Sequence, residues 1–164
     1  MTTIACDLRP LWEKNWGGVS WYCYHLVQGL VKSAAANQCR LILFYNHYKL
    51  LDGSMAQLLS RWRKAPNVQI RGYRIPNKLL NFSMRFFKFP YIDDLLTIQQ
   101  FNNLTIDYFI MPNLNFIALT PKTKLVMVCH DLSPEIFPEF FTPHQRLWHW
   151  LINPRALYSR ADQL

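Results

Sequence analysis

Five short apolar runs, separated by stretches of helical periodicity and polar loops, constrain the fold of this chain more than any other feature. Each run has the length of a strand and ends at polar residues or Pro; they are Ile4–Cys6, Arg40–Tyr45, Val68–Tyr73, Asp107–Pro112 and Lys124–His130. Strands that alternate with helices form right-handed crossovers, which build a mostly parallel sheet. We therefore expect a doubly wound α/β domain with helices on both faces of its sheet.

Helices between these runs are indicated by apolar residues at spacings of three and four positions. The clearest covers Val19–Val31 and follows a polar loop at Asp7–Gly18. Further helices are expected at Met55–Trp62, Ile92–Asn102, Pro143–Trp150 and Pro154–Arg160. The segment Lys78–Tyr91 mixes apolar and basic residues before Pro90 closes it.

The length of 164 residues corresponds to about one domain of roughly 150 residues, so we expect a single domain over residues 1–164. Apolar residues make up 51% of the chain, enough to offset the entropy of ordering it, and they exclude a disordered chain. Residues 161–164 resemble the approach to a further strand. The chain is therefore expected to be the first part of a longer protein.

The excess of 18 Lys and Arg residues over 10 Asp and Glu residues gives a net charge of +8, which favours an anionic partner. Nucleic acid, an anionic membrane surface and a phosphorylated small molecule all fit that charge. The positive charge is concentrated in one part of the chain: eight of the basic residues lie within residues 61–88, interleaved with Trp and Phe.

This basic, aromatic segment has three interpretations. It suits anionic lipid headgroups, with Arg85, Phe86, Phe87 and Lys88 at the membrane surface. The same residue types stack nucleic-acid bases, or form an ordinary solvated face over a Phe-rich core. No helix-turn-helix, zinc-finger or RNA-recognition signature favours nucleic acid.

The longest stretch free of Asp, Glu, Lys and Arg runs from Asn15 to Val31, shorter than the ~20 residues that a membrane-spanning helix needs. The first residues carry no basic n-region and predict a strand instead of a signal peptide. A cytoplasmic location is the expectation that follows. The four cysteines form no CxxC pair and are expected to behave as small hydrophobic residues.

Polar residues gather where the predicted strands end, and in a parallel sheet those ends share one edge. Ligands of such sheets bind in the crevice at that edge. The residues are Asp7 and Arg9 after the first run, Gly17 and Gly18 before the first helix, Asn113 and Asn115 after the fourth run, and His130 and Asp131 after the fifth. Although they are far apart in sequence, we expect them to be neighbours in the fold.

Two of these positions have a specific chemical rationale. Gly17 and Gly18 let the backbone approach a ligand, and the helix that follows offers free N–H groups to a phosphate; the same pair also fits a helix start without a ligand. His130 would donate to a substrate hydroxyl or act as an acid or base, or else be a packed histidine at a strand end. No metal site is expected, because His130 lacks a second ligand with supporting spacing and His144 and His149 do not share a helical face.

Several stretches together resemble the N-terminal half of bacterial family 4 (group 1) glycosyltransferases. They are Cys6–Pro10, Gly17–Val19 with Tyr22, Met111–Phe116, His130–Ser133 and Phe137–Phe141, and the tail Arg146–His149, Asn153–Ala156 and Arg160–Asp162 continues the similarity. The resemblance covers essentially the whole chain, and its last third is the specific part.

The resemblance implies a GT-B enzyme, in which two Rossmann-like domains face a cleft. Such an enzyme transfers a sugar from a nucleotide-sugar donor to a glycan or lipid-linked acceptor with retention of configuration, often in polysaccharide synthesis, and needs no cofactor and no metal. The N-terminal domain mainly receives the acceptor, whereas the following domain, absent from this sequence, holds most nucleotide contacts and a pair of glutamates. This chain alone is therefore expected to have little or no transferase activity.

The resemblance also implies roles for single residues. Gly17 and Gly18 match glycines that approach the donor diphosphate, and His130 matches the catalytic histidine that contacts the transferred sugar. The positions with a binding or architectural role in the cleft are Asp7, Arg9, Asn113, Asn115 and Asp131. The family usually continues from the glycine pair with an Arg, whereas this chain has Trp21 after Ser20, so a cationic contact from this helix start is not implied.

A second hypothesis is a non-catalytic α/β module that binds a membrane surface or a protein partner through the basic, aromatic segment. The first hypothesis adds an expectation of its own: an isolated half of a two-domain enzyme exposes apolar surface, which predicts self-association.

Overall fold

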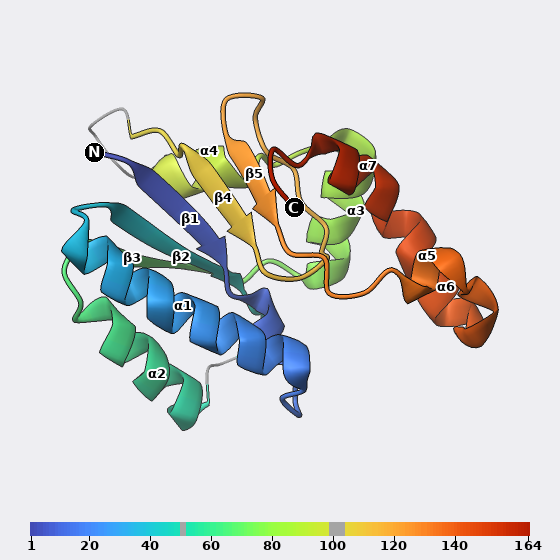
Figure 1. The fold of residues 1–164 in the computed structure, drawn as a ribbon, viewed down its shortest axis with the longest axis horizontal. Helices are drawn as coiled ribbons and strands as arrows, with labels where there is room; N and C mark the ends of the chain where they lie inside the picture. Colours follow the sequence, from blue (N-terminus) through green and yellow to red (C-terminus); the bar gives the residue numbers. More distant parts are fainter. Residues whose placement is uncertain (50–51, 99–103) are drawn as a thin grey trace.

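Strands and helices alternate along the chain in the computed structural model, which describes residues 1–49, 52–98 and 104–164 (Figure 1). In chain order the elements are β1 (Thr3–Asp7), the 3-10 helix η1 (Arg9–Trp12), α1 (Gly18–Ala36), β2 (Arg40–Asn46), α2 (Gly53–Arg63), β3 (Val68–Tyr73), α3 (Asn77–Phe87), α4 (Ile92–Thr97), β4 (Tyr108–Met111), β5 (Lys124–Met127), α5 (Ser133–Ile136), the 3-10 helix η2 (Pro138–Phe140), α6 (Pro143–Ile152) and α7 (Pro154–Arg160).

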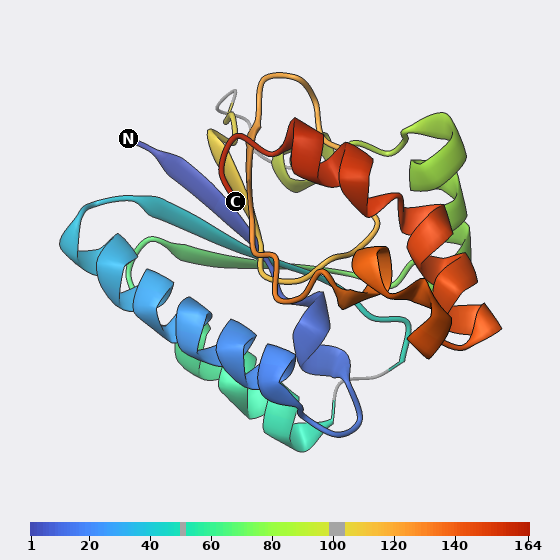
Figure 2. The same cartoon turned by 45° about the vertical axis from the view of Figure 1, so that its right-hand side comes forward.

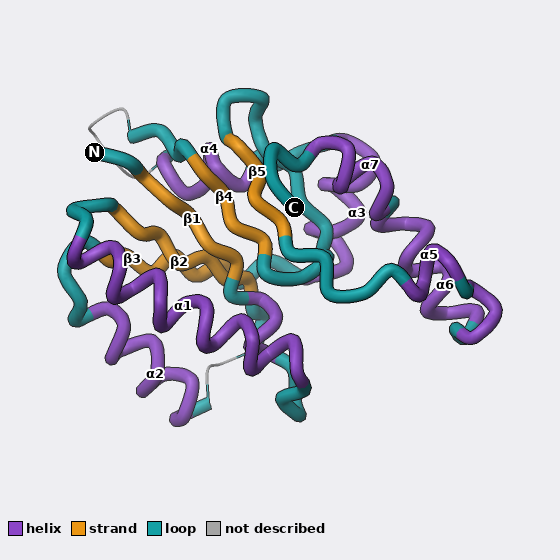
Figure 3. Tube along the Cα trace, viewed as in Figure 1, coloured by secondary structure: helices purple, strands orange, loops and turns teal. Residues whose placement is uncertain are grey.

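The strands of the described ranges form one sheet with the order β3-β2-β1-β4-β5, and every pairing is parallel. The order reverses at β1, because the chain first adds strands on one side of β1 and then on the other. Figure 3 shows the strands as a continuous layer with helices on either side. The fold is thus the expected doubly wound, Rossmann-like α/β fold, with a wholly parallel sheet.

Each face of the sheet carries its own apolar core, because side chains alternate along a strand. On β2, Leu41 and Leu43 belong to the core shared with α1 and α2, whereas Ile42 and Phe44 belong to the core shared with α3, α4, α6 and α7. Figure 2 shows the two sets of helices on opposite sides of the sheet. The near-continuous apolar run of β2 reflects this burial on both faces.

Several helix starts have local explanations in the sequence. The Asp52 carboxylate accepts a hydrogen bond from the Met55 N–H (2.8 Å) and caps α2. Thr142 and Gln145 form a reciprocal capping box at the start of α6. Of the described helices, none is long and apolar enough to cross a membrane.

Two of the expected boundaries need correction, and one segment without an expected structure contains a helix. The loop expected at Asp7–Gly18 is wrong in part, since Asp7 ends β1 opposite Phe44 of β2 and η1 forms a turn just after it. The last strand ends at Met127: the Val128 N–H still donates to the Met111 carbonyl (3.0 Å), but His130 lies beyond the sheet. The mixed segment after Pro76 contains a helix, α3.

The helix expected at residues 92–102 is confirmed as α4 for Ile92–Thr97, and residues 99–102 lie outside the described residues. The tail at residues 161–164, expected to approach a further strand, lies along the edge of the sheet. Gln163 forms a parallel bridge with Val126, and its carbonyl accepts a hydrogen bond from the Met127 N–H (2.9 Å) at the free edge of β5.

Candidate functional site

Polar side chains at the carboxyl ends of the strands line two cavities. The first, of about 270 Å³, is bordered by Arg9, Trp12, Glu13, Asn46, His47, Asn77, Asn81 and Asn115. The second, of about 210 Å³, is bordered on its polar side by Asn113, His130, Asp131 and Glu135. Of the predicted site residues, Arg9 and Asn115 line the first cavity and Asn113, His130 and Asp131 line the second. Asp7, Gly17 and Gly18 line neither.

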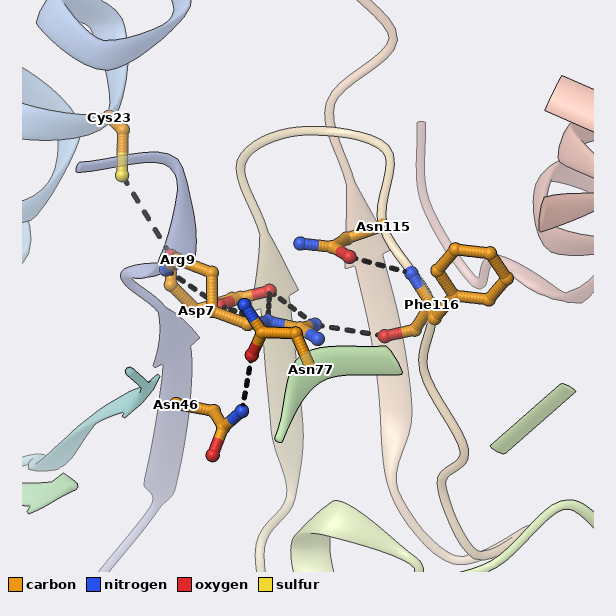
Figure 4. A network of polar contacts seen from close by, with 7 residues as sticks. All are labelled: Asp7, Arg9, Cys23, Asn46, Asn77, Asn115 and Phe116. Atoms are coloured by element: carbon orange, nitrogen blue, oxygen red, sulfur yellow. Dashed lines mark hydrogen bonds and ion pairs between the residues drawn. The ribbon is translucent and has the colours of Figure 1, made fainter. Parts of the chain in front are cut away.

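A buried ion pair between Asp7 and Arg9 lies at the first cavity. The Arg9 Nε and Nη2 atoms donate to the Asp7 carboxylate at 2.9 and 2.7 Å, and Nη2 also donates to the Phe116 carbonyl at 2.9 Å. The Arg9 side chain is only 9% exposed and the Asp7 side chain 1%. Figure 4 shows the guanidinium between the end of β1 and the loop after β4. The pair joins the end of β1 to the loop after β4, so in this structure Asp7 and Arg9 have an architectural role.

Asparagines form the polar wall of the first cavity. The buried Asn46 amide donates to the Ile75 carbonyl (2.8 Å) and to the Asn77 Oδ1 atom (2.6 Å), and its own oxygen accepts from the Ile75 N–H. The Asn115 oxygen accepts from the Phe116 N–H (2.8 Å; Figure 4). Burial, followed by the charge of Lys49, lowers the pKa of His47 in the same wall. Apart from Arg9 and Glu13, the lining of this cavity is therefore uncharged and rich in hydrogen-bonding groups. Such a lining suits a polar, hydroxylated ligand.

The Gly17-Gly18 pair lies at the N-terminus of α1, with Gly17 as the residue that precedes the helix. Neither glycine has a positive φ, and a Cβ atom on either would meet no atom within 4 Å. No dihedral angle or contact inside the protein therefore requires glycine here. The first turn of this 19-residue helix has no acidic side chain, so its N–H groups keep their positive potential.

His130 lies between α1 and the loop after β4. Its Nε2 atom is 2.7 Å from the Pro112 carbonyl oxygen, and its ring meets that of Tyr22 edge to face, with centroids 5.0 Å apart. A carbonyl only accepts hydrogen bonds, so Nε2 carries a proton, and in the neutral ring Nδ1 is the atom with the free lone pair. His130 is exposed. It is thus held in one tautomer at the carboxyl edge, with one nitrogen left for a ligand.

Asp131 follows His130 but serves the next helix. Its Oδ1 atom accepts hydrogen bonds from the Ser133 hydroxyl (2.6 Å) and the Ser133 N–H (2.7 Å). These bonds, the side-chain one first, lower the pKa of Asp131. Its role at this edge is therefore to stabilise the turn into α5.

The residues expected at a membrane surface lie elsewhere, at the C-terminal end of α3. Phe86, Phe87 and Lys88 are exposed, and Arg85 is half-buried. Leu79, Phe82 and Phe89 are exposed beside them, with exposed fractions between 54% and 64%. We call the five apolar residues together, Leu79, Phe82, Phe86, Phe87 and Phe89, the α3 patch.

Sequence reasoning missed Asn46, His47, Asn77 and Asn81. The first two follow the expected run Arg40–Tyr45 directly, so the rule applied to the first, fourth and fifth runs would have found them. Asn77 and Asn81 are four residues apart on α3, a spacing that puts both on one face of a helix. Their helix was not recognised, so neither was their common face.

The cavities contain no metal site of ordinary composition: among the described residues, no three His, Cys, Asp or Glu side chains are grouped to hold an ion. The parallel sheet, together with the polar cavities beyond the carboxyl ends of its strands, makes this a Rossmann-like α/β domain with a polar crevice at that end of the sheet. No family model, curated protein or solved structure matches the chain.

Proposed function

We propose that this chain is the acceptor-side domain of a GT-B glycosyltransferase, which transfers a sugar with retention from a nucleotide-sugar donor to a glycan or lipid-linked acceptor. The observation that carries the proposal is the place of His130 at the carboxyl edge, held by Pro112 and packed against Tyr22 in the first turns of α1. The sequence resemblance supports the same assignment.

The proposal gives each of these residues a role. The N–H groups that follow Gly17 and Gly18 offer positive potential to the donor diphosphate, where negative charge grows as the bond to the sugar breaks. His130 Nδ1 accepts a hydrogen bond from a hydroxyl of the transferred sugar and orients it. Asn115 and the asparagine wall face the hydroxyl groups of an acceptor, and Asn113 lines the cavity of His130.

This domain supplies half of the catalytic environment, and the second Rossmann-like domain of the family would supply most of the nucleotide contacts. Little or no sugar transfer is therefore expected from this chain by itself. The location that the proposal implies is the cytoplasm, at the inner face of the membrane where lipid-linked acceptors would be met.

Nucleotide-sugar binding, followed by amide NMR, tests the proposal. Titration with nucleotide diphosphate sugars should shift the amide signals of Gly17 and Gly18 and the ring signals of His130, with affinities in the millimolar range. His130→Ala should weaken binding several-fold, whereas His144→Ala, an exposed histidine on α6, should not. Shifts confined to residues outside this edge, or none with any donor, would rule the proposal out.

A second candidate function is supported by the α3 patch. An apolar surface flanked by Lys78 and Lys88 fits a peripheral contact with an anionic membrane, whether or not the chain takes part in catalysis. Phe86→Ser/Phe87→Ser should reduce co-sedimentation with phosphatidylglycerol vesicles about tenfold or more, since burial of each Phe side chain contributes ~2 kcal/mol to the free energy of binding. Phe140→Ser, a matched change at an 81% exposed phenylalanine of η2, should leave it unchanged.

Reversing charge at Arg85 and Lys88 separates the two parts of this contact. Co-sedimentation that survives Arg85→Glu/Lys88→Glu would exclude the electrostatic part, and co-sedimentation that survives the two Phe changes would exclude the apolar part.

A further inference from the structure

A cavity of about 350 Å³ lies between α3 and the helices that follow β5; it adjoins the cavity of His130, with which it shares Glu135 and His149, and is separate from that of Arg9 and Asn115. Its charged lining comes from four elements: Arg85 of α3, Glu135 of α5, Arg146 of α6 and Arg155 of α7. The rest of the wall includes His149 and apolar side chains such as Phe141 and Trp150. Three arginines thus line one partly apolar space.

The carboxylate in this cavity is already paired. The Arg155 Nε atom donates to the Glu135 carboxylate at 2.8 Å, and Arg155 is 80% exposed. Within residues 1–49, 52–98 and 104–164, no carboxylate lies within ion-pair distance of Arg85 or Arg146. Two cationic groups therefore face the cavity without a counter-ion from the described residues.

Two nitrogen atoms in the same lining are buried without a partner. The Nε atom of Arg85 and the Nδ1 atom of His149 are shielded from solvent and have no hydrogen-bond partner in the described part of the chain. The Arg85 guanidinium lies 5.8 Å from the ring centre of Phe86, a cation–π contact that leaves the Nε hydrogen unsatisfied. A buried donor without an acceptor is costly and rare in native proteins, so the Arg85 side chain is under-satisfied where it borders the cavity.

We propose that this cavity binds the phosphate group of an organic phosphate ester, with Arg85 and Arg146 as its principal ligands. Phosphate is favoured because a monoester carries close to two negative charges at neutral pH, which matches the two uncompensated arginines, and because its oxygens fit the guanidinium fork. An organic substituent is favoured because the cavity is larger than a phosphate ion and has apolar walls. This inference does not depend on sugar transfer.

His149 adds a weaker contact. Burial lowers the pKa of this histidine, with the Glu135 charge as an opposing effect, so the ring is neutral at pH 7. A bound phosphate would favour the protonated ring and raise that pKa again. The ring signals of His149 therefore report on occupancy of the cavity.

Binding of phenyl phosphate, measured by calorimetry and by the ring signals of His149, tests the site. Arg85→Gln and Arg146→Gln should each weaken binding about 10- to 100-fold, the loss expected for one charge-assisted contact. Arg61→Gln, an equal change of charge at an exposed position on α2, should have no effect. Arg85→Lys keeps the charge without the fork and should bind with intermediate affinity.

Two further arms identify the source of the phosphate and guard against misfolding. Phosphatidic acid vesicles that bind the chain more tightly than phosphatidylcholine vesicles, and are released by phenyl phosphate, would assign a lipid headgroup; binding of phenyl phosphate alone would assign a soluble ester. Arg146 is exposed, so Arg146→Gln should fold even if Arg85→Gln does not, and thermal unfolding checks both. Equal affinity of both variants and the unaltered chain, or no saturable binding of either probe, would overturn the inference.

Discussion

At the scale of single residues, the parallel register places Gly72 of β3 opposite Tyr45 of β2, where no side chain fits. A Cβ atom on Gly72 would lie 2.1 Å from the Tyr45 Cζ atom. The Tyr45 ring is also stacked on Trp12, with centroids 4.7 Å apart, so it cannot move away without losing that contact. Gly72 therefore serves to admit Tyr45, and through it to position η1 beside the first cavity.

Gly72→Ala should lower the free energy of unfolding by about 1–3 kcal/mol, the usual cost of overpacking. In a Tyr45→Ala background the same change should be neutral or stabilising, because the obstructing ring is gone. Gly29→Ala is the control: its Cβ has open space on α1, and a gain of roughly 0.5–1 kcal/mol is expected. Urea unfolding of the unaltered chain, the two single variants and the double variant measures the coupling between Gly72 and Tyr45. An equal cost of Gly72→Ala in both backgrounds would contradict it.

The thiols give a second residue-scale prediction. Burial raises the pKa of Cys23 to about 12, with the Asp7 charge as a smaller cause, and burial likewise raises that of Cys6 well above its usual range. Cys129 is exposed. At pH 8 an aromatic disulfide reagent should thus modify Cys129 rapidly and Cys6 and Cys23 only after unfolding.

The sign of the linkage follows from the same shift. The folded pKa of Cys23 lies above the unfolded value of about 8.5, so the neutral thiol is favoured in the fold and stability falls as pH rises above about 8.5. Cys23→Ala should reduce that loss. Fast modification of Cys23 in the folded chain would show that the thiol is accessible.

At the scale of elements, the Asp7–Arg9 pair joins β1 to the loop after β4. Arg9→Met should cost about 3–5 kcal/mol, because it leaves the Asp7 carboxylate buried and uncompensated. Asp7→Asn/Arg9→Met should recover part of that loss, since no charge is then buried. Chemical denaturation measures both variants, and equal stability of the single and double variants would exclude burial of charge as the cause.

Periodicity and strand length were sufficient to predict most of the elements. Strand Val68–Tyr73 and helix Pro154–Arg160 have the expected bounds, and the helix expected at Val19–Val31 is extended to Ala36. α3 was missed because its buried positions, Leu80 and Met84, are outnumbered by exposed Phe and Leu residues, so apolarity no longer marks the buried face.

The site was predictable in position but not in its contacts. The rule that ligands bind beyond the strands placed Asp7, Arg9, Asn115 and His130 at the correct edge. It could not show that Arg9 is held by Asp7 and the Phe116 carbonyl, because that carbonyl is 107 residues away in sequence. Tertiary partners of this kind have no local signature.

At the scale of the whole molecule, the sheet has two edges, and the edge at β5 is partly closed by residues 161–164. The Asp162 N–H donates to the Leu125 carbonyl (2.8 Å), while the Asp162 carboxylate accepts from the Leu125 N–H at the same distance. Leu125 is fully buried. Asp162 thus provides hydrogen-bond partners for both the N–H and the carbonyl of Leu125 in a core strand, and connects the last helix to the sheet.

Asp162→Ala should lower the free energy of unfolding by about 1–3 kcal/mol, because the Leu125 N–H loses the Asp162 carboxylate as its acceptor and is left unpaired at the sheet edge. An unpaired strand edge also pairs readily with another chain, so the variant should self-associate more than the unaltered chain. Asp94→Ala, at an exposed carboxylate of α4, is the control. Urea unfolding and sedimentation velocity measure the two effects; unchanged stability with unchanged association would show that Asp162 does not close the edge.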